Sequence, residues 1–404
     1  MRIAIFTNNY LPNPYGVSSS IESFRQELEK LGHTVYIFAP RWKGYVDDNK
    51  NTCPPENFSN KNFGWVFRYP SLDIKFKFRF PLPISYSPKM DVILEKLEID
   101  IIHSQHPDLL GSAAMRWAKK KNVPLIFTWH TLYDQYVHFI PVIPKKISAW
   151  WIIRRARLYA DKCDQVIVPT PTIKKIIQNW GVKNKNIIAI PTGVEIETFE
   201  NYDRKLIRAK YDIQDDEILL LVVARLTEEK NILFLFEPIA DILKNNSKVK
   251  FIVVGDGYLR AELENFAQKN DVGNQIFFAG VVLRSEIRNY YAASDIFVFS
   301  SKSETQGMIL TEAMYMNLPI VAVNATGACD IVLQNKTGFL VAQDKKEFSQ
   351  AVEKLIESKS LREDFAREAG KIAQEEYTSE ACTKKLLQIY TETIEKNNNK
   401  KMIQ

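Results

Sequence analysis

The sequence predicts an α/β protein built from two doubly wound domains. Apolar runs of strand length, such as Leu219–Ala224 and Phe251–Val254, alternate with amphipathic segments of helix length. This alternation is typical of parallel sheets covered by helices. A chain of 404 residues is long enough for two cores. We therefore expect one domain over residues 1–190, a second over 191–375, and a C-terminal helix with a frayed tail over 376–404.

The individual elements follow from the hydrophobic periodicity along the chain. Residues 41–86 contain Pro54-Pro55 and Asn-rich segments, so we expect loops and a hairpin there. In the first domain we expect strands over 2–7, 34–39, 100–103, 124–128 and 165–168, and helices over 17–31, 88–97, 108–121, 145–162 and 171–179. After a linker near 190–200, strands near 218–223, 250–254, 275–278, 295–299 and 319–323 should alternate with helices.

The composition is that of a soluble globular protein, with 46% hydrophobic and 25% charged residues. The four cysteines are scattered without a C-x-x-C or metal-ligand spacing, which favours reduced thiols in the cytosol and excludes a zinc motif. Residues 1–10 alternate like a strand and carry no cleavage site, so we expect no signal peptide. No apolar run reaches the 18 residues of a membrane span.

Charge is divided unevenly between the two halves of the chain. Residues 1–190 hold 27 Lys and Arg against 15 Asp and Glu, whereas the remainder holds 27 against 33. A basic N-terminal half should attract a polyanionic surface, either anionic lipid or nucleic acid. We favour lipid, because no base-reading motif accompanies the charge.

Two glutamates eight residues apart form the most informative motif. Glu304 follows the apolar stretch Ile296–Phe299, and Glu312 lies in the helix expected after Gly307. Ligands bind at the carboxyl ends of strands in such sheets, and an ionised carboxylate accepts hydrogen bonds from sugar hydroxyls. The alternative is that both glutamates are ordinary solvated residues, because the spacing alone is permissive.

Two further strand-to-helix turns carry groups suited to phosphate. Arg225 and Lys230 follow the run that ends at Ala224, and Gly255-Asp256-Gly257 follows the run that ends at Val254. Arginine can grip a diphosphate with two hydrogen bonds, and lysine supplies a point charge. Each turn by itself is equally consistent with solvated charges, but three such turns within 90 residues favour a binding site.

Together, these motifs resemble the donor-binding half of the retaining family-4 glycosyltransferases with the GT-B fold. The N-terminal half also resembles that family in its first strand and glycine loop (Met1–Val17), in Ile101-Ile-His103-Ser-Gln-His-Pro, and in Thr128-Trp-His130-Thr. The resemblance covers nearly the whole chain. It implies two Rossmann-like domains facing a central cleft, with the C-terminal helix crossing back to the first domain.

The resemblance also implies roles for single residues. Arg225 and Lys230 would hold the diphosphate, Glu304 the hexose hydroxyls, Glu312 the ribose, and His130 a hydroxyl near the reacting carbon, so the implied catalytic residues are His130, Arg225, Lys230 and Glu304. Further donor-binding residues would be Gly16, Gly255, Asp256, Val281, Gln306, Gly307 and Met308. The sequence departs from the family by a single glycine in Tyr15-Gly16-Val17 and by Thr305-Gln306 after the first glutamate.

One segment narrows the resemblance. Residues 127–139 are similar to a segment of bacterial diacylglycerol glucosyltransferases, and Tyr133, Tyr136 and His138 in it are candidates for the acceptor side. Tyr15 either narrows the glycine loop or faces the acceptor. Residues 143–158 predict a basic helix with paired tryptophans, as expected for interfacial anchoring; the candidate membrane contacts are Lys145, Lys146, Trp150, Trp151, Arg154, Arg155 and Arg157. The alternative is a surface helix whose tryptophans belong to the core. Residues 73–80 alternate aromatic and cationic residues, which makes them a second candidate for contact with lipid; the alternative is an edge strand with a solvated cationic face.

We therefore expect a hexosyltransferase that moves a hexose, such as glucose from a UDP-linked donor, to a lipid such as 1,2-diacylglycerol. It would act from the cytoplasm at the inner face of the membrane, with no catalytic metal, no other cofactor and no nucleic acid partner. A glycosyltransferase with a soluble or polysaccharide acceptor is the alternative, and a non-enzymatic sugar-nucleotide-binding protein is a third hypothesis. The nucleotide base, the hexose, the exact acceptor and the oligomeric state are left open by the sequence.

Overall fold

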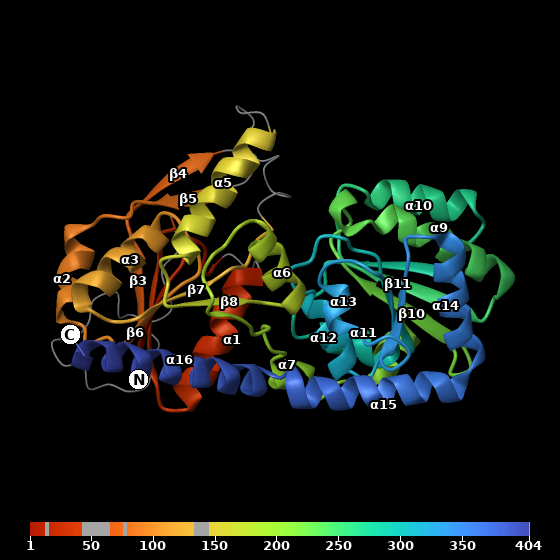
Figure 1. Ribbon diagram of the computed structural model, residues 1–404. Coiled ribbons are helices and arrows are strands. Elements are labelled where there is room, and N and C mark those ends of the chain that lie inside the picture. The colour runs from red at the N-terminus through yellow and green to blue at the C-terminus, as the bar shows by residue number, and fades with distance from the viewer. Residues whose placement is uncertain (13–15, 43–64, 76–78, 133–144, 404) are drawn as a thin grey trace. The chain divides into compact units, whose positions relative to one another are not determined.

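Two parallel sheets, each covered by helices on both faces, form the framework of the chain, as the ribbon shows (Figure 1). The structure, a computed structural model, describes residues 1–12, 16–42, 65–75, 79–132 and 145–403; of these, 73–75, 79, 80, 145, 146 and 403 are described by their backbone alone. Unit 1 comprises Met1–Thr192 with Cys382–Gln404, and unit 2 comprises Gly193–Ala381. The predicted α/β fold class with two doubly wound sheets is confirmed.

The sheet of unit 1 has β1 at its centre and, within the described residues, runs in the order β3-β2-β1-β6-β7-β8-β9. Ile3 of β1 pairs with Val35 of β2 on one side and with Ile101 of β6 on the other, all in parallel. Its strands are β1 (Arg2–Phe6), β2 (Thr34–Pro40), β3 (Trp65–Tyr69), β6 (Ile101–Ser104), β7 (Leu125–Thr128), β8 (Gln165–Val168) and β9 (Ile187–Ala189).

Helices bury a different core on each face of this sheet. On one face the rings of Phe6 and Phe38 stack at 4.5 Å, and those of Phe38 and Phe67 at 5.1 Å. This core is covered by α2 (Pro88–Lys96), α3 (Leu110–Lys121), α5 (Lys145–Ala160) and α6 (Pro171–Asn179). The opposite core includes Ile3 and Ile5 and is covered by α1 (Gly16–Lys30) and α16 (Ser379–Ile403). Among the described residues, no helix has both the length and the apolar character that crossing a membrane requires.

The C-terminal helix α16 returns to unit 1, as expected. Leu386 and Tyr390 are buried in the core that contains Ile3. The expectation of a frayed tail is wrong, since α16 continues to Ile403. Two polar contacts secure this last part: the Asn397 amide donates to the Asn122 carbonyl at 3.4 Å, and Lys400 pairs with Asp164 at 3.7 Å.

The stretch 41–86 contains one sheet strand more than expected. Strand β3 pairs with β2 and buries Trp65, Phe67 and Tyr69 on one side, an alternation that the sequence analysis did not assign. The expected hairpin is present as β4 (Ser71–Lys75) and β5 (Arg79–Pro83), which pair antiparallel. The side chains of the alternating segment 73–80 lie outside the described residues.

Unit 2 repeats the plan with a parallel sheet that, in the described part of the chain, runs β12-β11-β10-β13-β14-β15. The strands are β10 (Ile218–Val223), β11 (Val249–Val254), β12 (Ile276–Gly280), β13 (Ile296–Phe299), β14 (Ile320–Val323) and β15 (Gly338–Val341). The helices are α7 (Ile196–Phe199), α8 (Arg204–Lys210), η2 (Glu228–Lys230), α9 (Ile232–Asn245), α10 (Arg260–Lys269), α11 (Ile287–Ala293), α12 (Met308–Tyr315), α13 (Ala328–Ile331), α14 (Lys345–Glu357) and α15 (Lys359–Glu376).

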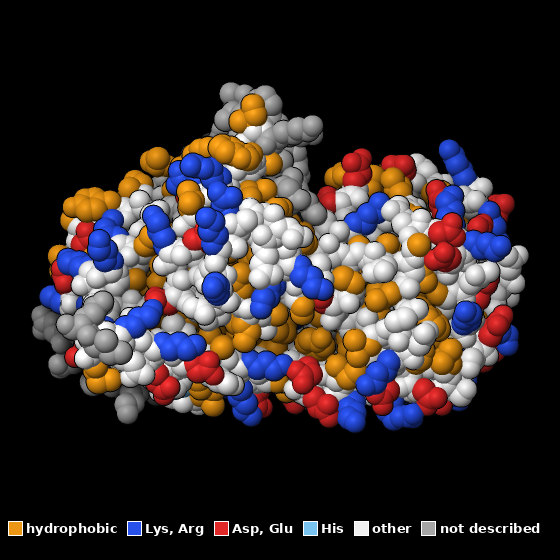
Figure 2. Space-filling model, in the orientation of Figure 1, with side chains coloured by type: hydrophobic (Ala, Val, Ile, Leu, Met, Phe, Trp, Pro, Cys, Tyr) orange, Lys and Arg blue, Asp and Glu red, His pale blue; other side chains and the backbone are white. Residues whose placement is uncertain are grey.

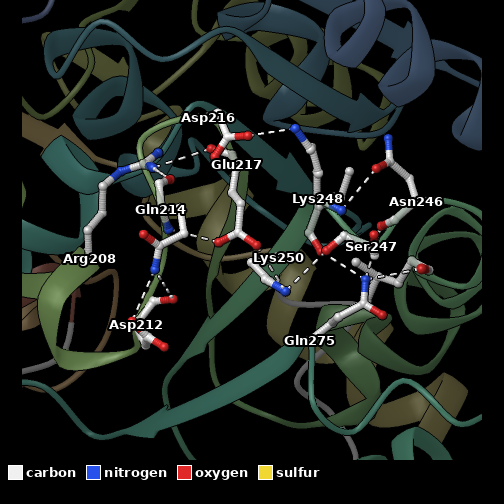
Figure 3. A network of polar contacts seen from close by, with 12 residues as sticks. Arg208, Asp212, Gln214, Asp216, Glu217, Asn246, Ser247, Lys248, Lys250 and Gln275 are labelled. Carbon is white, nitrogen blue, oxygen red and sulfur yellow. Dashed lines mark hydrogen bonds and ion pairs between the residues drawn. The ribbon is translucent and has the colours of Figure 1, made fainter.

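A network of polar contacts lies at the N-terminal ends of the strands in the sheet of unit 2 (Figure 3). The Gln275 amide donates to the carbonyls of Leu243, Asn246 and Val249 at 3.0–3.1 Å. Lys250 pairs with Glu217 at 3.2 Å. The three bonds of Gln275 satisfy buried carbonyl groups, which would destabilise the fold if they had no partner. The N-terminal edge is thus occupied by structural contacts.

A buried histidine joins α16 to the sheet of unit 1. His103 Nδ1 lies 2.7 Å from the Tyr390 hydroxyl, and His103 Nε2 lies 2.6 Å from the Thr128 hydroxyl. The His103 side chain is 3% exposed. Burial lowers the pKa of His103 to about 3. The imidazole is therefore neutral near pH 7.

We expect the free energy of unfolding of unit 1 to fall as the pH decreases from 6.5 towards about 3, because in this window only the unfolded chain binds a proton at His103. His103 should contribute a loss of about 2 kcal/mol between pH 7 and pH 5, at about 1.4 kcal/mol per pH unit. The variant His103→Gln should lack this contribution. Urea unfolding followed by tryptophan fluorescence measures it, because all seven tryptophans lie in residues 1–192.

The partly exposed His33 provides a matched control, since His33→Gln should change the pH dependence less than His103→Gln. If wild type and His103→Gln lose the same stability between pH 7 and pH 5, the buried neutral imidazole is not supported.

Candidate functional site

Three strands of unit 2 end at the same edge of the sheet. β10 pairs in parallel with β11 on one side and with β13 on the other. Their C-terminal ends are therefore neighbours, and so are the turns that follow them. These turns contain the predicted Arg225 and Lys230, Gly255 and Asp256, and Glu304. The parallel pairing thus brings together groups that lie up to 80 residues apart in the sequence.

An ion pair connects the first and third of these turns. Lys230 Nζ lies 2.5 Å from Glu304 Oε1, and each side chain is only 17% exposed. Two further contacts hold the turns together: the Asn231 amide donates to the Ser300 carbonyl at 3.1 Å, and the Ser300 hydroxyl donates to the Lys230 carbonyl at 3.0 Å. The ammonium and the carboxylate are therefore fixed in position by the surrounding backbone.

Glycines make room for Glu304. Gly327 has φ +85°, and a Cβ added there would lie 2.7 Å from Glu304 Cβ. Gly307, at φ +80°, directly precedes α12 and allows the turn between Glu304 and the helix. Gln306 is buried and Met308 is half-buried. The segment around Glu304 is thus closely packed.

Gly255 lets the second turn approach the first. Its φ is +126°, and a Cβ would lie 1.9 Å from the Ala224 carbonyl oxygen. The neighbouring Asp256 contacts residues close to it in the sequence. One carboxylate oxygen accepts from the Gly257 amide at 2.7 Å, and the other pairs with Arg260 at 3.3 Å. Gly255 therefore has a steric role in the turn, whereas Asp256 makes contacts within its own turn.

Glu312 has a different environment from Glu304. Its carboxylate is 5% exposed, and it accepts from Arg284 Nη1 at 2.6 Å and from the Tyr291 hydroxyl at 2.9 Å. Burial, and next the charge of Glu312, raise the pKa of Tyr291 well above its usual value. The sequence analysis missed Arg284 and Tyr291. Arg284 lies four residues after the end of β12. A cation shortly after a strand end was the signal in the sequence by which Arg284 could have been recognised as a site residue.

Two predicted donor-binding residues are not brought into contact with the ion pair. The side chain of Arg225 is 62% exposed and pairs with Glu229 at 3.1 Å. Val281 is 81% exposed, just after β12. Both lie near the ends of strands at the same edge of the sheet, and their side chains are open to solvent.

In unit 1, His130 follows the end of β7 and contacts β6. Its Nε2 lies 2.6 Å from Gln105 Oε1, which can only accept, so Nε2 carries the proton and Nδ1 is the acceptor nitrogen of the ring. Desolvation, together with the neighbouring His106 and His103, lowers the pKa of His130 to about 3. His130, His103 and Gln105 line a pocket together with Ser20, Thr128 and Thr192. Gln105 is a contact of His130 that the sequence analysis did not assign.

The glycine loop and the predicted acceptor-side residues are the remaining predictions for unit 1. Gly16 begins α1, and the space where its Cβ would lie is open. Tyr15, Tyr133, Tyr136 and His138 lie outside the described residues.

Helix α5 exposes aromatic and cationic side chains together. Trp150 is 62% exposed and Trp151 51% exposed, so the alternative that they belong to the core is wrong. The guanidinium of Arg154 lies 5.6 Å from the centre of the Trp150 ring, and that of Arg155 lies 4.6 Å from the Trp151 ring. Figure 2 shows hydrophobic and basic side chains gathered at the end of unit 1 that carries α5 in Figure 1.

The predicted cationic membrane contacts of α5 differ in their exposure and in their bonds to other side chains. Arg155 also bonds through Nε to the Asp108 carboxylate at 2.8 Å. Arg157 is half-buried, and Lys145 and Lys146 are described by their backbone alone. Arg154 is exposed. Because Ala156, Tyr159 and Ala160 on the other face are buried, the helix has one face in the core and one face open.

The described residues contain no group of three or more His, Cys, Asp or Glu side chains that could hold a metal ion. The cations at the edge of the unit 2 sheet are instead side chains: Arg225, Lys230 and Arg284. Each of them is paired with a glutamate. The arrangement suits an anionic ligand that also presents hydroxyl groups.

Comparison with known families matches almost the entire chain. A family described as "Glycosyltransferase Family 4" matches residues 14–198, and one described as "Glycosyl transferases group 1" matches residues 203–372. An alpha-monoglucosyldiacylglycerol synthase from Streptococcus pneumoniae is 30% identical over 99% of this chain and 88% of its own length. A protein of the same name from Acholeplasma laidlawii is 28% identical over 99% of each chain.

Solved structures share the fold at lower identity. The Anabaena protein HepE, in complex with UDP and glucose, is 17% identical and has a TM-score of 0.73 over 97% of this chain and 100% of its own. Sucrose-phosphate synthase from Thermosynechococcus elongatus is 20% identical and has a TM-score of 0.75 over 97% of this chain and 98% of its own.

Proposed function

Since this chain belongs to the family 4 glycosyltransferases and is a hexosyltransferase, we propose that it transfers glucose from UDP-glucose to a lipid hydroxyl such as that of 1,2-diacylglycerol, with retention at the anomeric carbon. The two similar synthases are named for a glucosyl diacylglycerol product. The observation that carries the lipid acceptor is the open face of α5, where Trp150 and Trp151 are exposed beside Arg154. Tryptophan with arginine is the combination found at membrane interfaces.

The donor site of this proposal is the edge of the unit 2 sheet. Lys230 and Arg225 bind the diphosphate, and Glu304 accepts hydrogen bonds from the hexose hydroxyls. The Lys230 ammonium is paired with the Glu304 carboxylate. Backbone amides near Gly16 and at the start of α12 add further donors to the phosphates, and the backbone at Val281 faces the base.

The reaction breaks the bond between the anomeric carbon and the diphosphate oxygen, so negative charge develops on the leaving phosphate. Fixed cations stabilise that charge most effectively where water is excluded. The lipid oxygen attacks the anomeric carbon from the face that the diphosphate leaves. Its proton passes to the departing phosphate oxygen, and Nδ1 of His130 accepts from a hexose hydroxyl nearby. No metal ion is required, because side chains and amides neutralise the diphosphate.

The proposal predicts a lipid product. Purified protein, labelled UDP-glucose and vesicles containing diacylglycerol should give a monoglucosyl lipid with an α linkage, and the same yield is expected in EDTA. UDP-galactose and GDP-mannose are the control donors. Transfer to a soluble sugar in place of the lipid would favour the alternative acceptor class, and activity that is abolished by EDTA and restored by magnesium would contradict the metal-free site.

Removing the Lys230 charge should weaken donor binding. We expect Lys230→Met to lower the affinity for UDP at least tenfold, because a hydrogen bond to a charged group contributes about 1.5–3 kcal/mol. Titration calorimetry measures it. Lys336, which pairs with Glu368 at 3.4 Å and is 54% exposed, supplies the matched control Lys336→Met. Equal affinities in the two variants would exclude Lys230 from the donor site.

The open face of α5 should bind anionic membranes. In vesicle sedimentation, Trp150→Ser with Trp151→Ser should weaken binding at least tenfold, since two half-exposed aromatic side chains forfeit on the order of 2 kcal/mol of apolar burial. Arg154→Glu should remove the salt-sensitive part, because the screening length falls from roughly 10 Å at 0.1 M to 3 Å at 1 M salt.

Unit 2 provides the matched control for this experiment. Tyr202 and Leu206 are 55% and 53% exposed, so Tyr202→Ser with Leu206→Ser removes a similar apolar surface elsewhere. The proposal is contradicted if the two double variants sediment alike, or if wild type does not bind vesicles containing phosphatidylglycerol.

A further inference from the structure

The carboxylate of Glu312 is held at both oxygens by neighbours from other elements. Arg284 Nη1 donates to Oε1 at 2.6 Å, and the Tyr291 hydroxyl donates to Oε2 at 2.9 Å. Arg284 lies between β12 and α11, Tyr291 lies in α11, and Glu312 lies in α12. The two contacts therefore fix the plane of the carboxylate, which a single contact would leave free to rotate.

Each oxygen retains capacity to accept another hydrogen bond. A carboxylate offers about four lone-pair sites, and the described contacts occupy one on each oxygen. Both oxygens of the one carboxylate can therefore accept a further hydroxyl group. This capacity matches the two hydroxyl groups of the ribose that the family resemblance assigns to Glu312.

Arg284 is itself held in place. Its guanidinium lies 5.3 Å from the centre of the Phe199 ring, and Phe199 is buried. Burial is the largest single effect and lowers the pKa of Arg284, but the charge and the hydrogen bond of Glu312, together with Tyr291 and Glu195, raise it overall. The guanidinium therefore stays charged, while half of the side chain remains exposed beside Leu283 and Val281, which are 66% and 81% exposed.

We propose that Arg284 is a positioning residue of the donor site, which holds Glu312 so that its carboxylate accepts hydrogen bonds from both ribose hydroxyls of the nucleotide. The inference rests on the proposed function, because it assigns the nucleotide to the edge of the sheet where β12 and β13 end. Arg284 acts through Glu312 and does not contact the reacting atoms. By holding Glu312 in place, Arg284 gives the enzyme selectivity for ribonucleotides over deoxyribonucleotides.

A purely structural contact would also explain the geometry, because Arg284 and Tyr291 link the segment after β12 to α12. The two roles differ in one measurable respect. A structural contact supports every ligand of the site equally, whereas a positioning contact contributes more to ligands that carry both hydroxyls than to ligands that carry one. Discrimination between UDP and its deoxy forms therefore separates them.

The test is titration calorimetry with UDP, 2′-deoxy-UDP and 3′-deoxy-UDP. Wild type should bind UDP about tenfold more tightly than either deoxy form, as expected for one lost hydrogen bond to a charged group. Arg284→Met should weaken the binding of UDP about tenfold more than it weakens the binding of either deoxy form, which keeps one of the two hydroxyls, so that the discrimination disappears. Arg284→Lys, which retains the charge, should recover part of it, and Glu312→Gln should resemble Arg284→Met.

A matched control is available in the same unit. Arg204 is 53% exposed and pairs with a carboxylate, Asp295, at 3.2 Å. Arg204→Met should leave the ratio of UDP to deoxy-UDP affinity unchanged. Thermal unfolding of each variant shows whether it is folded, and Arg284→Lys keeps the test valid if Arg284→Met does not fold.

Each result supports or overturns the inference. If Arg284→Met weakens UDP and the deoxy forms equally, Arg284 is structural and the inference is wrong. If wild type binds UDP and the deoxy forms alike, the inference is wrong but the proposed donor stands. If wild type binds GDP and not UDP, the proposed donor is wrong, and the same comparison with 2′-deoxy-GDP decides the inference. If it binds no nucleoside diphosphate, both are wrong.

Discussion

Parallel pairing of β10 with β11 and β13 is the constraint on which the candidate donor site depends. Parallel strands end at a common edge, so the turns after them meet however far apart they lie in the sequence. The ion pair between Lys230 and Glu304 at 2.5 Å exists only because those two turns are neighbours. The bonds of Asn231 and Ser300 then fix the turns to each other, so that the charged groups are held by the backbone and not by solvent.

The two glutamates of this edge show how environment separates groups of the same chemistry. Glu304 shares its charge with one lysine, in a turn shaped by Gly307 and Gly327. Glu312, eight residues later, is buried and held by an arginine and a tyrosine. A partly open carboxylate with one partner can exchange that partner for a ligand, whereas a clamped carboxylate presents fixed acceptor sites. The division between hexose and ribose, which the family resemblance implies, is compatible with this difference.

Unit 1 combines a rigid polar interior with an open helix face. His103 and His130 are neutral; both ring nitrogens of His103 and Nε2 of His130 are bonded to Tyr390, Thr128 and Gln105. Because both imidazoles are neutral, they add no charge that would change near pH 7. On the outside, α5 keeps Trp150 and Trp151 exposed although its other face is buried. Half or more of each of these side chains is open to solvent, and we assign that open surface to an external partner.

The sequence by itself determined the two parallel sheets, most strands to within a few residues and the residue types at the ends of strands, because these follow from local periodicity and turn chemistry. It did not reveal β3, the contact of Gln105 with His130, or the clamp of Arg284 and Tyr291 on Glu312. Each of those depends on which segments lie side by side. Whether Trp150 was core or surface was likewise undecided, since both faces of α5 contain apolar residues. Only the tertiary structure settled these points, because burial and long-range pairing are properties of the folded chain.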